Sequence, residues 1–100
     1  MKENQQMMEI EKRHLKIFGR VQGVGFRHFT VQRARELNLT GWVKNMSDGT
    51  VETVIEGPGE NVGQMIDKLK KGPRTARVVD IREMDAAGEQ DNFQDFTVRR

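Results

Sequence analysis

One stretch of the sequence, residues 19–27 (GRVQGVGFR), combines permissive backbone with a cation. Gly19, Gly23 and Gly25 can adopt positive φ, which lets successive backbone N–H groups converge on an anion, and a helix start adds further unpaired N–H groups. Arg27 falls in the first turn of an expected helix, where the helix dipole disfavours a cation. A bound anion removes that conflict, because a guanidinium can hold two phosphate oxygens at once. The stretch predicts a phosphate-binding loop, with a purely structural glycine-rich turn as the alternative.

The phosphate expected at this loop is small and terminal. The stretch lacks the G-x-G-x-x-G pattern of dinucleotide-binding turns. It also lacks the Lys-Ser or Lys-Thr pair that serves magnesium and the γ-phosphate of nucleoside triphosphates. Neither a dinucleotide nor a nucleoside triphosphate is therefore expected as the ligand.

Asn45 is a second polar candidate, because asparagine is uncommon in strands. In a regular strand Asn45 shares a face with Val43, where an unpaired amide is costly. The amide should bond to a ligand, or it should satisfy backbone groups of the turn at Ser47, Asp48 and Gly49. The residues alone leave both interpretations open.

The composition excludes several classes of chemistry. The 100 residues carry 17 basic and 15 acidic side chains, a net charge of +2, without the long basic run of a nucleic-acid-binding protein. The absence of cysteine excludes disulfides, thiolate catalysis and cysteine-ligated metals. His14 and His28 have no carboxylate or cysteine at metal-ligand spacing, so a surface or helix-face position is expected for both. Neither a metal nor a cofactor is expected.

The amino-terminal residues are polar and aperiodic, which predicts a flexible tail over residues 1–11 followed by a single domain over 12–100. The sequence has no secretory signal and no run of about 18 apolar residues. We therefore expect a cytoplasmic protein without a membrane partner.

Hydrophobic periodicity predicts alternating strands and helices. Leu15 and Ile17 alternate with polar residues in the manner of a half-buried strand, and Asp48-Gly49 is typical of a tight hairpin turn. The expected elements are a strand over 14–20, a helix over 26–38, two strands within 40–57, a helix within 58–72, a strand over 76–86, a loop over 87–92 and a short edge strand within 93–100.

The order of these elements is βαββαβ plus a short C-terminal strand. The buried face of the first helix is expected at Phe26, Phe29, Ala34 and Leu37. Two helices can cover only one face of a sheet of this size, so the sequence predicts an α+β fold of the ferredoxin-like kind. We expect a two-layer α/β sandwich with a mainly antiparallel sheet and both helices on one face.

Two motifs in order, GRVQGVGFR and GWVKNMSDGTVE, resemble the paired signatures of the acylphosphatase family. The similarity extends from the first expected strand through the last. The resemblance implies hydrolysis of acyl phosphates, which are mixed anhydrides of carboxylic and phosphoric acid, to a carboxylate and inorganic phosphate. It also implies the ferredoxin-like fold.

By this resemblance, Arg27 binds the phosphoryl group and Asn45 positions the attacking water, without a metal or a phosphoenzyme. No Asp, Glu or His base is evident beside Asn45, so we expect the substrate phosphate to accept the proton of the water. The loop backbone implied to bind the phosphate comprises Arg20, Val21, Gln22, Gly23, Val24, Gly25 and Phe26. The implied partners are a small-molecule acyl phosphate and inorganic phosphate, as product and competitive inhibitor, and a monomer is expected.

Two other interpretations stay open. One is a non-catalytic module that binds a phosphorylated metabolite, or a stand-alone relative of the acylphosphatase-like domains of larger carbamoyl-transfer proteins. The other is an RNA-binding sheet, because GVGFRHF superficially resembles an aromatic RNA-binding strand motif. In the expected fold this run opens a helix, so its aromatic side chains would pack inward.

Overall fold

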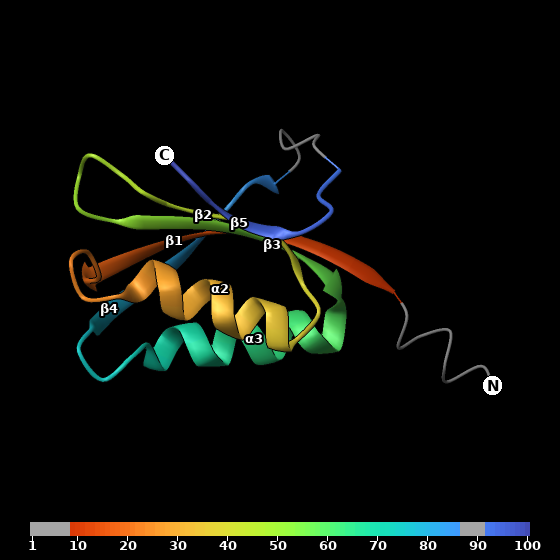
Figure 1. Cartoon of the computed structure of the whole chain (residues 1–100), viewed down its shortest axis with the longest axis horizontal. Helices are drawn as coiled ribbons and strands as arrows, with labels where there is room; N and C mark the ends of the chain where they lie inside the picture. Colours follow the sequence, from red (N-terminus) through yellow and green to blue (C-terminus); the bar gives the residue numbers. More distant parts are fainter. Residues whose placement is uncertain (1–8, 87–91) are drawn as a thin grey trace.

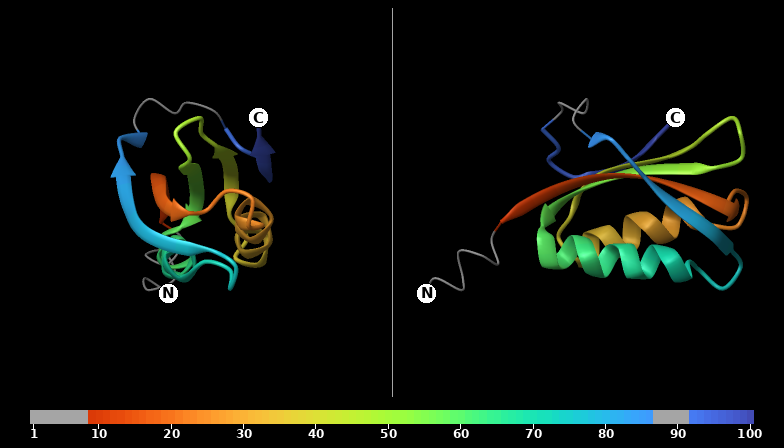
Figure 2. Two further views of the ribbon diagram at one scale, coloured as in Figure 1. Left: turned by 90° about the vertical axis from the view of Figure 1, so that its left-hand side faces the viewer. Right: turned by 180° about the vertical axis from the view of Figure 1, so that it is seen from behind.

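A computed structural model of the chain describes residues 9–86 and 92–100 and has two layers, a sheet and a pair of helices (Figure 1). The five strands follow the order β4-β1-β3-β2-β5 across the sheet. Both helices lie against the same face (Figures 1 and 2). The elements are β1 (Ile10–Arg20), α2 (Phe26–Glu36), β2 (Thr40–Asn45), β3 (Val51–Pro58), α3 (Gly59–Lys71), β4 (Arg77–Met84) and β5 (Phe96–Arg99). The predicted fold class is confirmed.

The sheet is antiparallel except at one edge. Strand β1 pairs with β3 and β4, and β2 pairs with β3, all antiparallel. Strand β5 pairs parallel to β2, which makes it the short edge strand that the sequence predicted. The predicted alternation of buried and polar side chains in β1 is confirmed. Leu15 and Ile17 are 2% and 0% exposed and belong to the core between sheet and helices.

The two helices bury different kinds of face. Helix α3 buries Val62, Met65 and Leu69, three apolar residues at helical spacing, and leaves Ile66 half-buried. Helix α2 buries Phe26, Thr30 and Ala34, whereas the expected Phe29 and Leu37 are only half-buried. The buried Thr30 hydroxyl donates to the carbonyl of Phe26 at 2.8 Å, so the threonine carries no unpaired polar atom into the core.

Strand β1 begins earlier than the alternation indicated. Ile10 and Glu11 pair with Pro58 and Gly57, and Glu9 accepts a hydrogen bond from the backbone N–H of Gly59 at 3.0 Å. Residues 10 and 11, which were expected in a flexible tail, therefore belong to the sheet. Residues 1–8 of the expected tail lie outside the described residues, as does most of the loop expected over 87–92.

Two other boundaries also differ from expectation. Helix α2 ends at Glu36 rather than near residue 38, because Asn38 adopts a left-handed φ of 57°. The hairpin between β2 and β3 has a five-residue connection, residues 46–50, rather than a tight turn at Asp48-Gly49 alone. Hydrogen bonds from Met46 N to Thr50 O and from Gly49 N to Met46 O close this longer connection.

The opposite face of the sheet carries polar and aromatic side chains. His14 and Glu52 form a 2.8 Å contact there, and the His14 ring meets the Trp42 ring edge-on with centroids 5.5 Å apart. Phe93, which precedes β5, contributes to this side, and its ring centroid lies 5.2 Å from the Lys12 ammonium. Among the described residues, no helix is long and apolar enough to cross a membrane.

Candidate active site

The glycine-rich loop connects the end of β1 to the start of α2. Gly23 and Gly25 adopt left-handed φ values of 73° and 78°, which explains why glycine occupies both positions. Gly25 is the N-cap of α2, and its carbonyl accepts the N–H of Phe29 at 3.0 Å. Within the described parts of the chain, the backbone N–H groups of residues 23–27 have no acceptor. These donors remain available to a ligand.

Gly19 has a different role from the one that the sequence suggested. It lies within β1, at a bulge in the pairing with β4, and its φ is 129°. A side chain there would collide with the backbone carbonyl of Arg77. Gly19 therefore permits the close approach of two strands, and the loop begins after it.

Two side chains attach the loop to neighbouring elements. The Gln22 amide donates to the carbonyls of Met46 and Thr50 at 2.8 and 2.9 Å, which links the loop to the β2–β3 hairpin. The Thr75 hydroxyl, in the connection between α3 and β4, donates to the carbonyl of Val24 at 2.6 Å. Gln22 was expected to contribute only its backbone to the loop. Thr75 was not expected at the site, because its contact joins residues far apart in the chain.

The hairpin is also held by an acidic side chain. One oxygen of Asp48 accepts the hydroxyl and the backbone N–H of Thr50 at 2.6 and 3.1 Å, and the other lies 2.9 Å from the Lys16 ammonium. These hydrogen bonds, that from the Thr50 hydroxyl foremost, hold the pKa of Asp48 well below its ordinary value. The connection that follows Asn45 is thereby fixed against β1.

Arg27 and Asn45, predicted from distant parts of the sequence, line one cavity of about 540 Å³. Arg27 projects from the first turn of α2 and is exposed, whereas Asn45 is half-buried at the end of β2. Four of the seven predicted loop residues line the same cavity, namely Val21, Gly23, Gly25 and Phe26, whereas Arg20, Gln22 and Val24 do not.

The side chain of Asn45 is free of the turn that follows it. Its amide forms no hydrogen bond with any other described residue, and the turn carbonyls of Met46 and Thr50 are occupied by Gln22 instead. The guanidinium of Arg27 likewise has no hydrogen bond or ion pair with the described residues. Both polar groups are therefore available to a molecule in the cavity.

The sequence matches the acylphosphatase family model over residues 13–98. The chain belongs to the acylphosphatase family. It is 54% identical over 87 residues to an acylphosphatase of Salinibacter ruber, a match that covers 85% of this chain and 88% of that protein. Acylphosphatases are enzymes, and membership implies hydrolysis of acyl phosphates.

Solved structures give the same assignment. An acylphosphatase from Bacillus subtilis superposes with a TM-score of 0.83 at 33% identity, over 92% of this chain and 100% of that one. Full-length HypF, in a phosphate- and nucleotide-bound form, contains a similar region with a TM-score of 0.78 at 31% identity. That match covers 93% of this chain but 12% of HypF. The acylphosphatase fold thus also occurs within a much longer protein.

Several lining residues of this acylphosphatase cavity were not identified from the sequence. Val31 and Arg35 follow Arg27 by four and eight positions along α2, so helical periodicity would have placed them on the same face. Residues of β5 reach the cavity because this strand pairs parallel to β2, and no local sequence pattern indicates that pairing. The additional lining residues are His28, Val31, Arg35, Phe96, Thr97, Val98 and Arg100.

The histidines occupy opposite sides of the sheet. His28 is exposed at the cavity, on α2, and His14 lies on the helix-free face beside Glu52. In residues 9–86 and 92–100, no three His, Asp or Glu side chains are grouped closely enough to hold a metal ion.

Proposed function

We propose that the protein hydrolyses acyl phosphates by direct in-line attack of a water molecule on a phosphoryl group held by Arg27 and the phosphate-binding loop. The Arg27 guanidinium would grip two phosphoryl oxygens, and the unpaired loop N–H groups would bind the remaining negative charge. An acyl phosphate already has a good carboxylate leaving group, so the enzyme has chiefly to orient the water and stabilise charge. Such a reaction does not require a metal ion.

The observation that carries this proposal is the shared cavity of Arg27 and Asn45, with the amide and the guanidinium both free of other described partners. Asn45 ends β2, while Arg27 begins α2, so the two groups approach one space from different layers. The amide oxygen of Asn45 can accept a hydrogen bond from a water and orient its lone pair toward the phosphorus.

The bond changes balance without a protein nucleophile. The water oxygen forms a bond to phosphorus as the bond between phosphorus and the acyl oxygen breaks, and the electron pair of that bond leaves on the carboxylate. A proton of the water passes to a phosphoryl oxygen of the substrate. This acceptor fits the cavity, because no Asp or Glu is among its described lining residues.

Hydrolysis of benzoyl phosphate after exhaustive EDTA treatment tests the proposal. We expect full activity and competitive inhibition by inorganic phosphate, because the product occupies the same loop as the substrate phosphoryl group. Loss of activity that added metal restores would overturn the metal-free mechanism. Uncompetitive inhibition by phosphate would contradict the proposed phosphate position.

A further inference from the structure

Lys16 lies outside the cavity, on the helix-free face of the sheet, yet it contacts the connection that follows Asn45. Its two neighbours in β1 have side chains in the core, which places Lys16 on the opposite face. The Lys16 ammonium lies 2.9 Å from Oδ2 of Asp48, in the β2–β3 connection, and 3.6 Å from Oε2 of Glu52. A cation outside the cavity is therefore tied to the segment that follows a candidate catalytic residue.

The Lys16 ammonium is itself held on the sheet. Glu52, its cross-strand partner on β3, is only 9% exposed, and the other carboxylate oxygen of Glu52 lies 2.8 Å from Nε2 of His14. The hydrogen bond to Asp48 raises the pKa of Lys16 above its ordinary value, so the side chain stays charged at neutral pH. Lys16 thus provides a fixed cation that holds Asp48.

The position of the Asn45 amide depends on the backbone of this connection. The amide forms no hydrogen bond with any other described residue, so no side-chain contact fixes its orientation. Asp48 accepts the backbone N–H and the hydroxyl of Thr50 at 3.1 and 2.6 Å. The carbonyl of Thr50 in turn accepts the N–H of Met46 at 2.9 Å. A continuous path of contacts therefore leads from Lys16 to the residue that directly follows Asn45.

The connection also contacts the phosphate-binding loop, which has further attachments of its own. Figures 1 and 2 show the β2–β3 connection and the β1–α2 loop at the same end of the molecule, and Gln22 joins the two by its bonds to the Met46 and Thr50 carbonyls. The loop is held independently by the hydrogen bond from Thr75 to Val24. Loss of Lys16 should therefore displace Asn45 more than it displaces the loop.

We propose that Lys16 is a positioning residue for the hydrolysis, which holds the β2–β3 connection through Asp48 so that the Asn45 amide orients the attacking water. The inference rests on the proposed function, because it assumes that Asn45 binds that water. Neither Lys16 nor Asp48 is among the described residues that line the cavity. Their ion pair acts through the conformation of the connection and not through contact with the substrate.

Lys16→Met tests this inference, because methionine keeps an unbranched apolar side chain and removes the ammonium. We expect kcat for benzoyl phosphate to fall about three- to tenfold, between the worth of an exposed ion pair and that of a charged hydrogen bond, while the inhibition constant of inorganic phosphate changes by less than about twofold. Lys16→Arg should restore kcat, since a guanidinium can also bind both carboxylates.

Asp48→Asn removes the other partner of the ion pair. Its amide oxygen can still accept hydrogen bonds from Thr50, so the turn keeps its internal contacts. This variant should lower kcat to a similar extent as Lys16→Met, and the double variant should be no slower than the slower single variant, because both changes remove the same interaction. If Lys16→Met does not fold, Asp48→Asn replaces it in each comparison below.

Lys12→Met is the matched control, because Lys12 lies four residues earlier on the same face of β1 and its side chain is also 21% exposed. Its ammonium likewise lies near its cross-strand glutamate, 3.8 Å from Glu56, but Glu56 is near the end of β3 away from the connection. Lys12→Met should leave kcat unchanged. Circular dichroism and the unfolding midpoint establish that the variants are folded.

A second comparison separates positioning of Asn45 from a general loss of stability. In an Asn45→Ala background no amide remains to be positioned, so Lys16→Met should have no further effect on kcat. An unchanged kcat in folded Lys16→Met, an equal fall in Lys12→Met, or an equal fall in the Asn45→Ala background overturns the inference, while turnover by the wild type leaves the proposed function intact. If the wild-type chain does not hydrolyse benzoyl phosphate, the proposed function fails and the inference fails with it.

Discussion

Asn45 should act on the chemical step and not on phosphate binding, because it is proposed to touch only the water. We expect folded Asn45→Ala to lower kcat by about 10² or more, while the inhibition constant of inorganic phosphate stays nearly unchanged. Steady-state kinetics with benzoyl phosphate and phosphate inhibition measure both quantities. A near-normal kcat in this variant would contradict the proposed positioning of the water and would leave Asn45 with only a structural role in the hairpin.

Arg27 should act on both phosphate binding and the chemical step, because its guanidinium is proposed to bind the phosphoryl group both before and during the reaction. Arg27→Ala should therefore raise KM, lower kcat and weaken phosphate inhibition together. Arg27→Lys should rescue poorly, since an ammonium cannot form the two parallel hydrogen bonds of a guanidinium. His28→Gln is the control at the same cavity, and it should keep the rate within a few-fold, whereas a catalytic base is typically worth about 10² to 10⁴.

At the level of elements, the sequence predicts most reliably where the physical cause is local. The alternation around Leu15 and Ile17 and the helical spacing of Val62, Met65 and Leu69 each indicate a buried face, and the structure has these faces. Burial of Thr30 was missed, because its polar group is satisfied only once the helix has formed. The extension of β1 to Ile10 was missed too, since it depends on pairing with a distant strand.

In the candidate site, too, residues with a local signal could be predicted and residues that depend on distant contacts could not. Arg27 conflicts with the dipole of its own helix, and Asn45 is unusual at the end of a strand, so both stand out locally. Gln22 and Thr75 look ordinary in the sequence, because their importance comes from hydrogen bonds to residues 24 or more positions away. Contacts of this range follow from the topology and cannot be derived from a local pattern.

The connection between α3 and β4 should contribute to phosphate affinity through Thr75. Its hydroxyl fixes the Val24 carbonyl at 2.6 Å and so orients the peptide bond that leads into Gly25. Thr75→Val should weaken phosphate inhibition about two- to tenfold, the range expected for one hydrogen bond, and Thr75→Ser should restore it. The measurement is the inhibition constant of phosphate beside the unfolding midpoint.

The matched control for Thr75 is Thr40→Val, at the end of β2 that lies away from Asn45. The Thr40 hydroxyl also donates to a backbone carbonyl, that of Glu56 at 3.5 Å, but it touches no part of the loop. Thr40→Val should leave phosphate inhibition unchanged. If Thr75→Val lowers only the unfolding midpoint and not the affinity, Thr75 stabilises the fold without positioning the loop.

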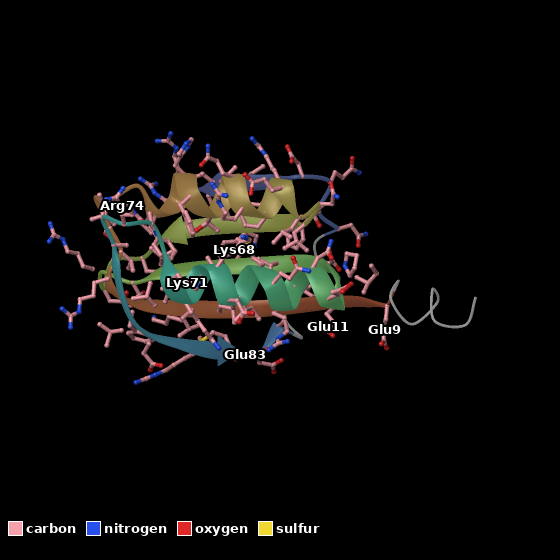
Figure 3. All side chains as sticks on the ribbon, turned by 90° about the horizontal axis from the view of Figure 1, so that it is seen from below. Glu9, Glu11, Lys68, Lys71, Arg74 and Glu83 are labelled. Atoms are coloured by element: carbon pink, nitrogen blue, oxygen red, sulfur yellow. The ribbon has the colours of Figure 1, made fainter. Side chains whose placement is uncertain are left out.

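For the whole molecule, charge is distributed unevenly along the long axis. Figure 3 shows Lys71 and Arg74 toward the end where β1 is followed by the glycine-rich loop, and Glu9 and Glu11 toward the opposite end. Lys71 ends α3, and Arg74 lies in the connection that carries Thr75, which contacts the loop. Because the net charge is only +2, we expect the placement of these charges to influence the field at the site more than the total charge does.

A positive field at the loop should draw anionic substrates toward the cavity. Neutralising it in Lys71→Gln/Arg74→Gln should lower kcat/KM for benzoyl phosphate several-fold at low ionic strength, with less change in kcat, because neither residue lines the cavity. The difference from the wild type should shrink as salt is added, since the Debye length falls from about 30 Å at 0.01 M to about 3 Å at 1 M. The control, Glu9→Gln/Glu11→Gln, removes two charges from the far end and should change kcat/KM little at any salt concentration. If both double variants respond alike, net charge rather than its placement governs capture of the substrate.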